Sequence, residues 1–171
     1  MKIAEIFNDK TLKSKALTEF LAVSIQQKAF DIPELLTFAE TSIDTKKATC
    51  IEAIEFVTKT NPEVLQKESL KRILNYIEEK APRIKWESAR VVGNTIHLYP
   101  ELITEATGKL LNNIEKQGTV VRWATAYALS EIIKLKTKFN SNLIPVIEQI
   151  INNEEKNSIK KIYLAALKKV K

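Results

Sequence analysis

Apolar residues recur along the chain at the spacing of amphipathic α-helices. In two stretches, four residues fall within about 60° of one another on a helical wheel, as core-facing residues of a helix do. No window of strand length alternates apolar and polar residues. We therefore expect an all-α protein. The two core-facing stripes consist of Lys85, Ala89, Val92 and Ile96, and of Arg122, Ala126, Leu129 and Ile133.

These stripes belong to an internal repeat. The pair Lys85-Trp86 aligns with Arg122-Trp123 at a spacing of 37 residues, and small and apolar residues follow in phase. Further shifts of 37 or 38 residues reach Lys47, then Lys10, and forward to Leu164. A repeat of this length is typical of helical arrays, in which each unit buries its apolar face against its neighbours.

A second helix is predicted in each unit, between the aligned segments. Pro33, Pro62, Pro100 and Pro145 each stand near the start of an amphipathic run, and the first three suit the first turn of a helix. We expect two antiparallel helices per unit and about four to five units of 37–38 residues, hence an α-α superhelix of nine or ten helices. Residues 1–171 would form a single domain of this kind.

Composition agrees with this fold and excludes several others. The chain has 171 residues, the size of one domain, and it is 44% hydrophobic and 28% charged, as folded soluble proteins are. Its 3 glycines and 5 prolines are too few for the turns of a many-stranded sheet. The N-terminal segment does not read as a signal peptide, and no stretch suits a membrane span. We expect a cytoplasmic protein with no membrane partner.

The sequence offers no chemistry typical of catalysis or metal binding. Cys50 and His97 are single residues of their kinds, so they form neither an internal disulfide nor a four-ligand zinc site. No phosphate loop, Ser-His-Asp order or HExxH motif is present. The adjacent carboxylates Glu78-Glu79 and Glu154-Glu155 point in different directions on a helix and are expected in solvent. We predict no enzyme activity, no cofactor, no metal and no small-molecule substrate.

The segment Val121-Arg122-Trp123-Ala-Thr-Ala-Tyr-Ala-Leu-Ser-Glu-Ile132 resembles the HEAT repeat, with its basic residue followed by Ala-rich apolar spacing. The resemblance extends over nearly the whole chain and is strongest at residues 82–133. It implies an α-solenoid whose second helices line a concave surface, and an interaction role rather than a reaction. The Asp that commonly accompanies the Arg in that family is matched only by Asp44.

Basic residues at the start of the core stripes need partners, because an unpaired buried charge is costly. We interpret Lys47, Lys85 and Arg122 as a ladder of contacts between repeats. Contact with an anionic ligand is the alternative.

A second stripe on the same helices holds the candidate partner-binding residues. Trp, Tyr and Arg are enriched at binding hot spots. Both tryptophans could instead pack between units, beside small residues such as Ala89 and Gly93, and the two interpretations stay open. Arg90 is the strongest candidate for recognition, and replacing Trp86 by Ala and Arg90 by Glu is expected to abolish binding without unfolding. The candidates are Trp86, Arg90, His97, Trp123 and Tyr127.

The net charge of +6 lies in the second half of the chain, where residues 81–171 hold 15 basic and 8 acidic side chains. The last sixteen residues contain six lysines and no acid. Such a segment attracts polyanions. The alternative is a solvent-exposed terminal helix whose lysines interact favourably with the negative end of the helix dipole. The possible polyanion-binding residues are Lys160, Lys161, Lys168 and Lys169.

Three functions are compatible with these patterns. The first is a non-enzymatic scaffold that binds a protein or peptide through its concave face. The second is a nucleic-acid binder, favoured by the basic second half and its aromatic residues. The third is an enzyme similar to the HEAT-like alkylpurine DNA glycosylases, which present an acidic residue among tryptophans. Here Arg90 and Tyr127 stand one turn after the tryptophans, and all three aspartates precede both.

Overall fold

The computed structural model describes residues 2–171, and within this range the chain forms helices and no strand. The all-α prediction is therefore confirmed. Three short 3₁₀ turns accompany the α-helices: η1 (Pro62–Val64), η2 (Ile96–Leu98) and η3 (Pro100–Leu102). The α-helices are α1 (Ile3–Asn8), α2 (Ser14–Gln26), α3 (Ile32–Glu40), α4 (Asp44–Thr58), α5 (Lys67–Tyr76), α6 (Pro82–Thr95), α7 (Ile103–Leu111), α8 (Thr119–Lys134), α9 (Asn140–Asn153) and α10 (Asn157–Val170).

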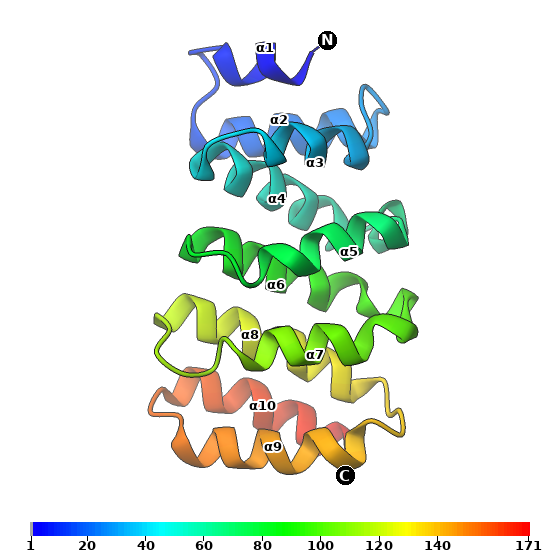
Figure 1. Ribbon diagram of the computed structural model, residues 1–171, viewed down its shortest axis with the longest axis vertical. Helices are drawn as coiled ribbons and strands as arrows, with labels where there is room; N and C mark the ends of the chain where they lie inside the picture. Colours follow the sequence, from blue (N-terminus) through cyan, green and yellow to red (C-terminus); the bar gives the residue numbers. More distant parts are fainter. Residues whose placement is uncertain (1) are drawn as a thin grey trace.

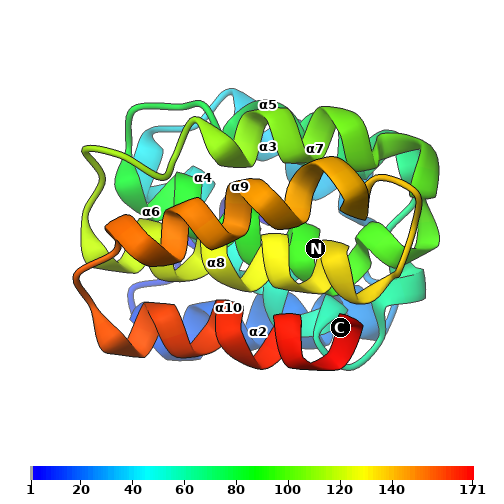
Figure 2. The same cartoon turned by 90° about the horizontal axis from the view of Figure 1, so that it is seen from below.

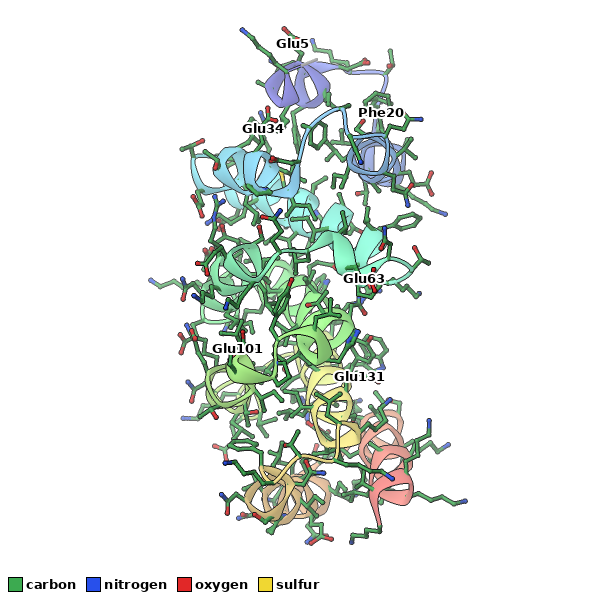
Figure 3. All side chains as sticks on the ribbon, turned by 90° about the vertical axis from the view of Figure 1, so that its right-hand side faces the viewer. Glu5, Phe20, Glu34, Glu63, Glu101 and Glu131 are labelled. Atoms are coloured by element: carbon green, nitrogen blue, oxygen red, sulfur yellow. The ribbon has the colours of Figure 1, made fainter. Side chains whose placement is uncertain are left out.

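The helices stack in two layers along one long axis (Figure 1). Helices α3, α5, α7 and α9 form the odd-numbered layer, while α2, α4, α6, α8 and α10 form the even-numbered layer and pack on one another in sequence order. Helices α2 and α10 stand out beyond α6 and α8 (Figure 2), so the even-numbered layer is shallowly concave on its open side (Figure 3).

The repeat read from the sequence is the repeat of the structure. Helices α4, α6, α8 and α10 begin at Asp44, Pro82, Thr119 and Asn157, which are 38, 37 and 38 residues apart. The predicted core stripes are also confirmed, because their apolar residues are at most 1% exposed. These buried residues are Ala89 and Val92 on α6, Ile96 at the start of η2, and Ala126, Leu129 and Ile133 on α8.

The prolines mark helix starts less uniformly than expected. Pro33 lies in the first turn of α3, where Asp31 caps the helix by accepting a hydrogen bond from the Glu34 amide at 2.8 Å. Pro62 and Pro100 open the 3₁₀ turns η1 and η3 rather than α-helices. Pro145, for which no first-turn position was predicted, lies inside α9, in its second turn. At this position the proline removes the backbone hydrogen bond that residue 145 would otherwise donate to the Ser141 carbonyl oxygen.

The basic residues that begin the core stripes contact the next repeat, which confirms the predicted ladder. The Lys47 ammonium donates to Glu79 Oε1 at 2.8 Å, and the Lys85 ammonium donates to Asn113 Oδ1 at 2.9 Å. Arg122 Nη1 donates to Glu154 Oε1 at 2.6 Å. Each acceptor lies just after the odd-numbered helix of the following unit. The cations of the ladder are thus bound within the chain.

This ladder also corrects the expectation that Glu154 faces solvent. Glu154 is 7% exposed and accepts a second hydrogen bond, from the Lys156 amide at 2.9 Å. It lies at the turn between α9 and α10, where Arg122 requires an anion. Glu79 is half-buried by its contact with Lys47, whereas Glu78 and Glu155 are exposed as predicted. Asp44, at the start of α4, is exposed.

Candidate binding face

The concave side of the even-numbered layer, hereafter the binding face, carries most of the predicted partner-binding residues. Trp86 and Arg90 project from α6, and both are partly exposed. Trp123 and Tyr127 project from α8, and Trp123 is 40% exposed. His97 is exposed but lies in the turn η2 beyond the end of α6.

The two tryptophans differ in their surroundings. Trp86 packs against the core, and its indole Nε1 donates to Glu87 Oε1 at 2.8 Å. Trp123 stacks on Tyr127 with ring centroids 6.4 Å apart and an angle of 14° between the rings. One tryptophan therefore serves largely in packing, while the other presents much of its indole to solvent.

Tyr127 joins α8 to α6. Its hydroxyl donates to Asn94 Oδ1 at 2.6 Å, and its ring lies directly over Gly93. A Cβ atom on residue 93 would clash with the Cε1 and Cδ1 atoms of this ring, so the close approach requires glycine. Burial raises the pKa of Tyr127 to about 12, and the neighbouring Glu131 adds to this effect. Its hydroxyl remains protonated and available as a donor at neutral pH.

Replacing Gly93 by alanine should destabilise the protein by about 1–3 kcal/mol, because the added methyl group displaces the packed Tyr127 ring. In a Tyr127→Ala background the same replacement should instead stabilise by roughly 0.5–1 kcal/mol, since alanine favours a helix interior over glycine. Urea unfolding of the four proteins measures both values. Equal effects of Gly93→Ala in the two backgrounds would contradict the close approach of ring and backbone.

Arg90 is held between two buried carboxylates. Its guanidinium lies 3.0 Å from Glu55 Oε1 on α4 and 3.3 Å from Glu87 Oε2 on α6. Glu55 and Glu87 are 5% and 3% exposed, and burial raises the pKa of Glu87. These two buried carboxylates, which the sequence patterns did not identify, require a cation beside them, so Arg90 has a structural role within the fold.

The same contacts change the expected outcome of reversing the charge at this position. A glutamate at residue 90 would place a third carboxylate beside Glu55 and Glu87, so Arg90→Glu would unfold the region rather than test binding alone. The spacing Glu87-x-x-Arg90 is a helical ion-pair signal that sequence reasoning could have used. The contribution of Glu55 depends on how α4 packs against α6.

Polar contacts continue from this cluster across neighbouring helices. Asn94 Nδ2 donates to the Glu55 carbonyl oxygen at 3.3 Å and to Thr58 Oγ1 at 3.2 Å, which ties α6 to α4. Towards the N-terminus, Glu52 on α4 accepts from Thr18 Oγ1 at 3.0 Å and pairs with Arg83. The cations of α6 on this face are therefore neutralised by glutamates of the chain itself.

Exposed apolar side chains concentrate on the even-numbered helices. Among residues 2–171, seven large apolar residues are classed as exposed, and five of them belong to this layer. Ile43 and Val146 are the two that lie elsewhere. The five are Val23 on α2, Phe56 on α4, Val120 and Trp123 on α8, and Leu164 on α10.

The C-terminal helix carries the predicted polyanion-binding lysines. Lys161, Lys168 and Lys169 are exposed, and Lys160 is half-buried. A cleft of about 240 Å³ lies on the surface between α8 and α10, which pack against each other, and Tyr127, Glu131 and Lys169 line it. Figure 3 shows Glu131 on the open side of α8, so this cleft belongs to the binding face.

A larger cleft lies away from these residues. It has a volume of about 670 Å³ and is bounded by α9 and by the connection between α7 and α8, beside the Arg122–Glu154 pair. Since that pair belongs to the ladder between repeats, its charges neutralise one another rather than attract an ion.

The remaining chemistry of the described residues is limited. Burial raises the pKa of the Cys50 thiol to about 12, so this cysteine lacks the thiolate character of a nucleophile. Within residues 2–171, no three His, Cys, Asp or Glu side chains are grouped so that they could hold a metal ion. No helix in that range is long and apolar enough to cross a membrane.

Designed armadillo repeat proteins share this arrangement of helices. The protein YIII(Dq)4CqI superposes with a TM-score of 0.72 at 15% sequence identity, over 99% of this chain and 81% of that one. This chain is a helical-repeat solenoid. A second solenoid, YIII(Dq.V1)4CPAF in complex with the peptide (KR)4, superposes with a TM-score of 0.59 at 13% identity, over 99% of this chain and 98% of that one. No protein family and no curated protein matches the sequence.

Proposed function

We propose that this solenoid is a non-enzymatic scaffold that holds a peptide segment of a protein partner on its binding face. The observation that carries the proposal is the row of exposed apolar side chains on α2, α4, α8 and α10. A peptide that runs along the stack would meet one such side chain on most of the helices it crosses. Apolar and aromatic anchors of this kind supply most of the affinity at protein interfaces.

Two further observations support a peptide ligand. Polar and ionic contacts among α4, α6 and α8 hold the middle of the face in one arrangement, and a preformed surface binds at a lower entropic cost. One structural neighbour is a complex with a peptide. The cations of α6 are already paired within the chain, so specificity towards the partner must come from other positions.

We also propose that the units are HEAT repeats. HEAT repeats have two helices per unit and armadillo repeats have three. In residues 2–171 each unit has two α-helices, and the additional helical segments between units are the short 3₁₀ turns η1, η2 and η3. The basic-Trp segments of α6 and α8 add the sequence pattern of that family.

Selection from a random peptide library displayed on phage tests the proposed function. The parent protein should enrich a set of related sequences, and the variant Phe56→Ala/Trp123→Ala should retain less than about a tenth of their affinity, since hot-spot truncations typically cost 2 kcal/mol or more. The matched control is Ile43→Ala/Val146→Ala, which also removes two exposed apolar side chains but outside the even-numbered layer. Equal losses for both variants, or no enrichment by the parent, would refute the proposal.

A further inference from the structure

The entire net charge of the chain lies in α8 and the segment that follows it. Residues 1–118 contain 17 basic and 17 acidic side chains, whereas residues 119–171 contain 10 basic and 4 acidic ones. The difference of six equals the net charge of the whole chain. One end of the solenoid is therefore strongly basic, while the rest is balanced.

The charge that a partner would meet is concentrated on α10. Arg122, Lys134 and Lys171 are paired with Glu154, Glu131 and Glu148. The four lysines of α10 that were predicted to attract polyanions form no ion pair within residues 2–171. Lys161 and Lys168 lie on the exposed side of this helix, two turns apart.

Apolar surface accompanies these lysines. Leu164 lies between Lys161 and Lys168 and is 50% exposed. The cleft between α8 and α10 has Ile162, Ala165 and Ala166 on its α10 side and the Tyr127 ring on its α8 side. At about 240 Å³ it is smaller than the pockets that enclose a drug-sized ligand, which have about 300–1,000 Å³. A space of this size suits one side chain of a larger partner.

We propose that the trough formed by α8 and α10 docks an acidic peptide segment. An apolar side chain of that segment would occupy the cleft, and its carboxylates would contact Lys169 at the cleft and Lys161 and Lys168 on the adjoining exposed side of α10. This inference rests on the proposed function, and it adds the chemical class of the partner and its place on the binding face. Charge complementarity selects an acidic partner, since these lysines form no ion pair within residues 2–171 and the nearby Glu131 is already paired with Lys134.

A peptide fits this surface better than a nucleic acid does. Lys134 in the cleft is already paired with Glu131, and the α10 side of the cleft is largely apolar, so the cleft suits an apolar side chain better than a phosphate. Trp123 and Leu164 expose apolar area that a phosphate backbone would leave in contact with water. A segment that alternates carboxylates with apolar side chains covers the lysines and the apolar surface together.

Fluorescence anisotropy of the full chain with a labelled peptide of alternating glutamate and leucine tests this assignment. The parent should bind this peptide and not a peptide of alternating lysine and leucine, and affinity should fall as salt is added. Lys168→Glu/Lys169→Glu should weaken binding at least about tenfold. Lys136→Glu/Lys138→Glu alters the net charge equally, in the exposed connection after α8, and should retain nearly the affinity of the parent. Circular dichroism of each variant shows whether it folds.

The cleft is tested separately. Ala165→Trp should fill the space between α8 and α10 and weaken the acidic peptide at least about tenfold, whereas Ala165→Ser should bind as the parent does. Equal losses for both lysine variants would show a general attraction to net charge and overturn the assignment. Tighter binding of duplex DNA than of the peptide, unaffected by Ala165→Trp, would also overturn it in favour of a nucleic-acid surface.

These outcomes separate the inference from the proposed function. If peptides from the library need Phe56 and Trp123 but ignore both Lys168→Glu/Lys169→Glu and Ala165→Trp, the trough assignment fails and the peptide scaffold stands. If the parent binds no peptide, both fail.

Discussion

Replacing Arg90 by methionine should destabilise the protein by about 3 kcal/mol, which is the lower end of the range for breaking a buried ion pair. Methionine retains much of the length of the side chain but leaves the carboxylates of Glu55 and Glu87 buried without their cation. The guanidinium is itself partly exposed, which places the loss at the lower end of the range. Chemical denaturation at neutral pH measures this loss.

The pH dependence of the Arg90→Met variant identifies the cause. Burial already raises the pKa of Glu87 in the parent, so this carboxyl favours folding when protonated and loses that contribution as the pH rises above its ordinary pKa of 4.5. Without Arg90 the pKa of Glu87 in the folded protein should rise further, so the stability lost on its ionisation should be larger in the variant. The difference in stability between variant and parent should therefore shrink as the pH is lowered towards 4.5.

A matched variant separates lost charge from lost packing. The triple variant Glu55→Gln/Glu87→Gln/Arg90→Met has no charge left to bury and should recover much of the stability. If the triple variant is as unstable as Arg90→Met alone, the loss reflects packing of the arginine stem rather than its charge.

Leu129→Ala should cost about 2–5 kcal/mol, because Leu129 is fully buried in the middle of α8 and its removal leaves a cavity. Helix α8 packs on both α6 and α10, so a loss in this helix weakens two interfaces between repeats. Hydrogen exchange should show faster amide exchange in both neighbouring units, and thermal unfolding gives the total loss.

The control for Leu129→Ala must be an exposed residue that makes no contact between repeats. Glu155→Ala is suitable because Glu155 is exposed, whereas the adjacent Glu154 completes the ladder through Arg122. A midpoint for Leu129→Ala equal to that of Glu155→Ala would mean that the buried stripe had been misassigned. Exchange confined to α8 would contradict the sharing of interfaces.

The division of charge along the stack gives the binding face two parts. Across α4 and α6 the cations are bound to glutamates of the chain, which stabilises the face without leaving charge for a partner. On α10 the lysines have no such partners within the described chain. Specific recognition is therefore expected at the C-terminal end, while the aromatic and apolar positions elsewhere contribute area.

Local patterns in the sequence determined the fold. The core stripes of α6 and α8 follow from helical periodicity alone, because burial of one helical side requires apolar residues at three- and four-residue spacing. The period of 37–38 residues follows from stacking of equivalent units, and it predicted the starts of successive even-numbered helices. The need of Lys47, Lys85 and Arg122 for partners in another repeat also followed from the cost of burying a charge.

The tertiary structure alone decided which residues are the partners of the ladder cations and of Arg90. Glu55 and Arg90 are 35 residues apart in the sequence, and Arg122 and Glu154 are 32 residues apart. The partners therefore lie in different repeats, and the periodicity of one helix does not identify them. Such contacts depend on how far each helix is rotated and shifted against the next, which the periodicity of a single helix does not specify. For the same reason the sequence left open whether Trp86 and Trp123 pack or project, and the stacking of helices gave each a different environment.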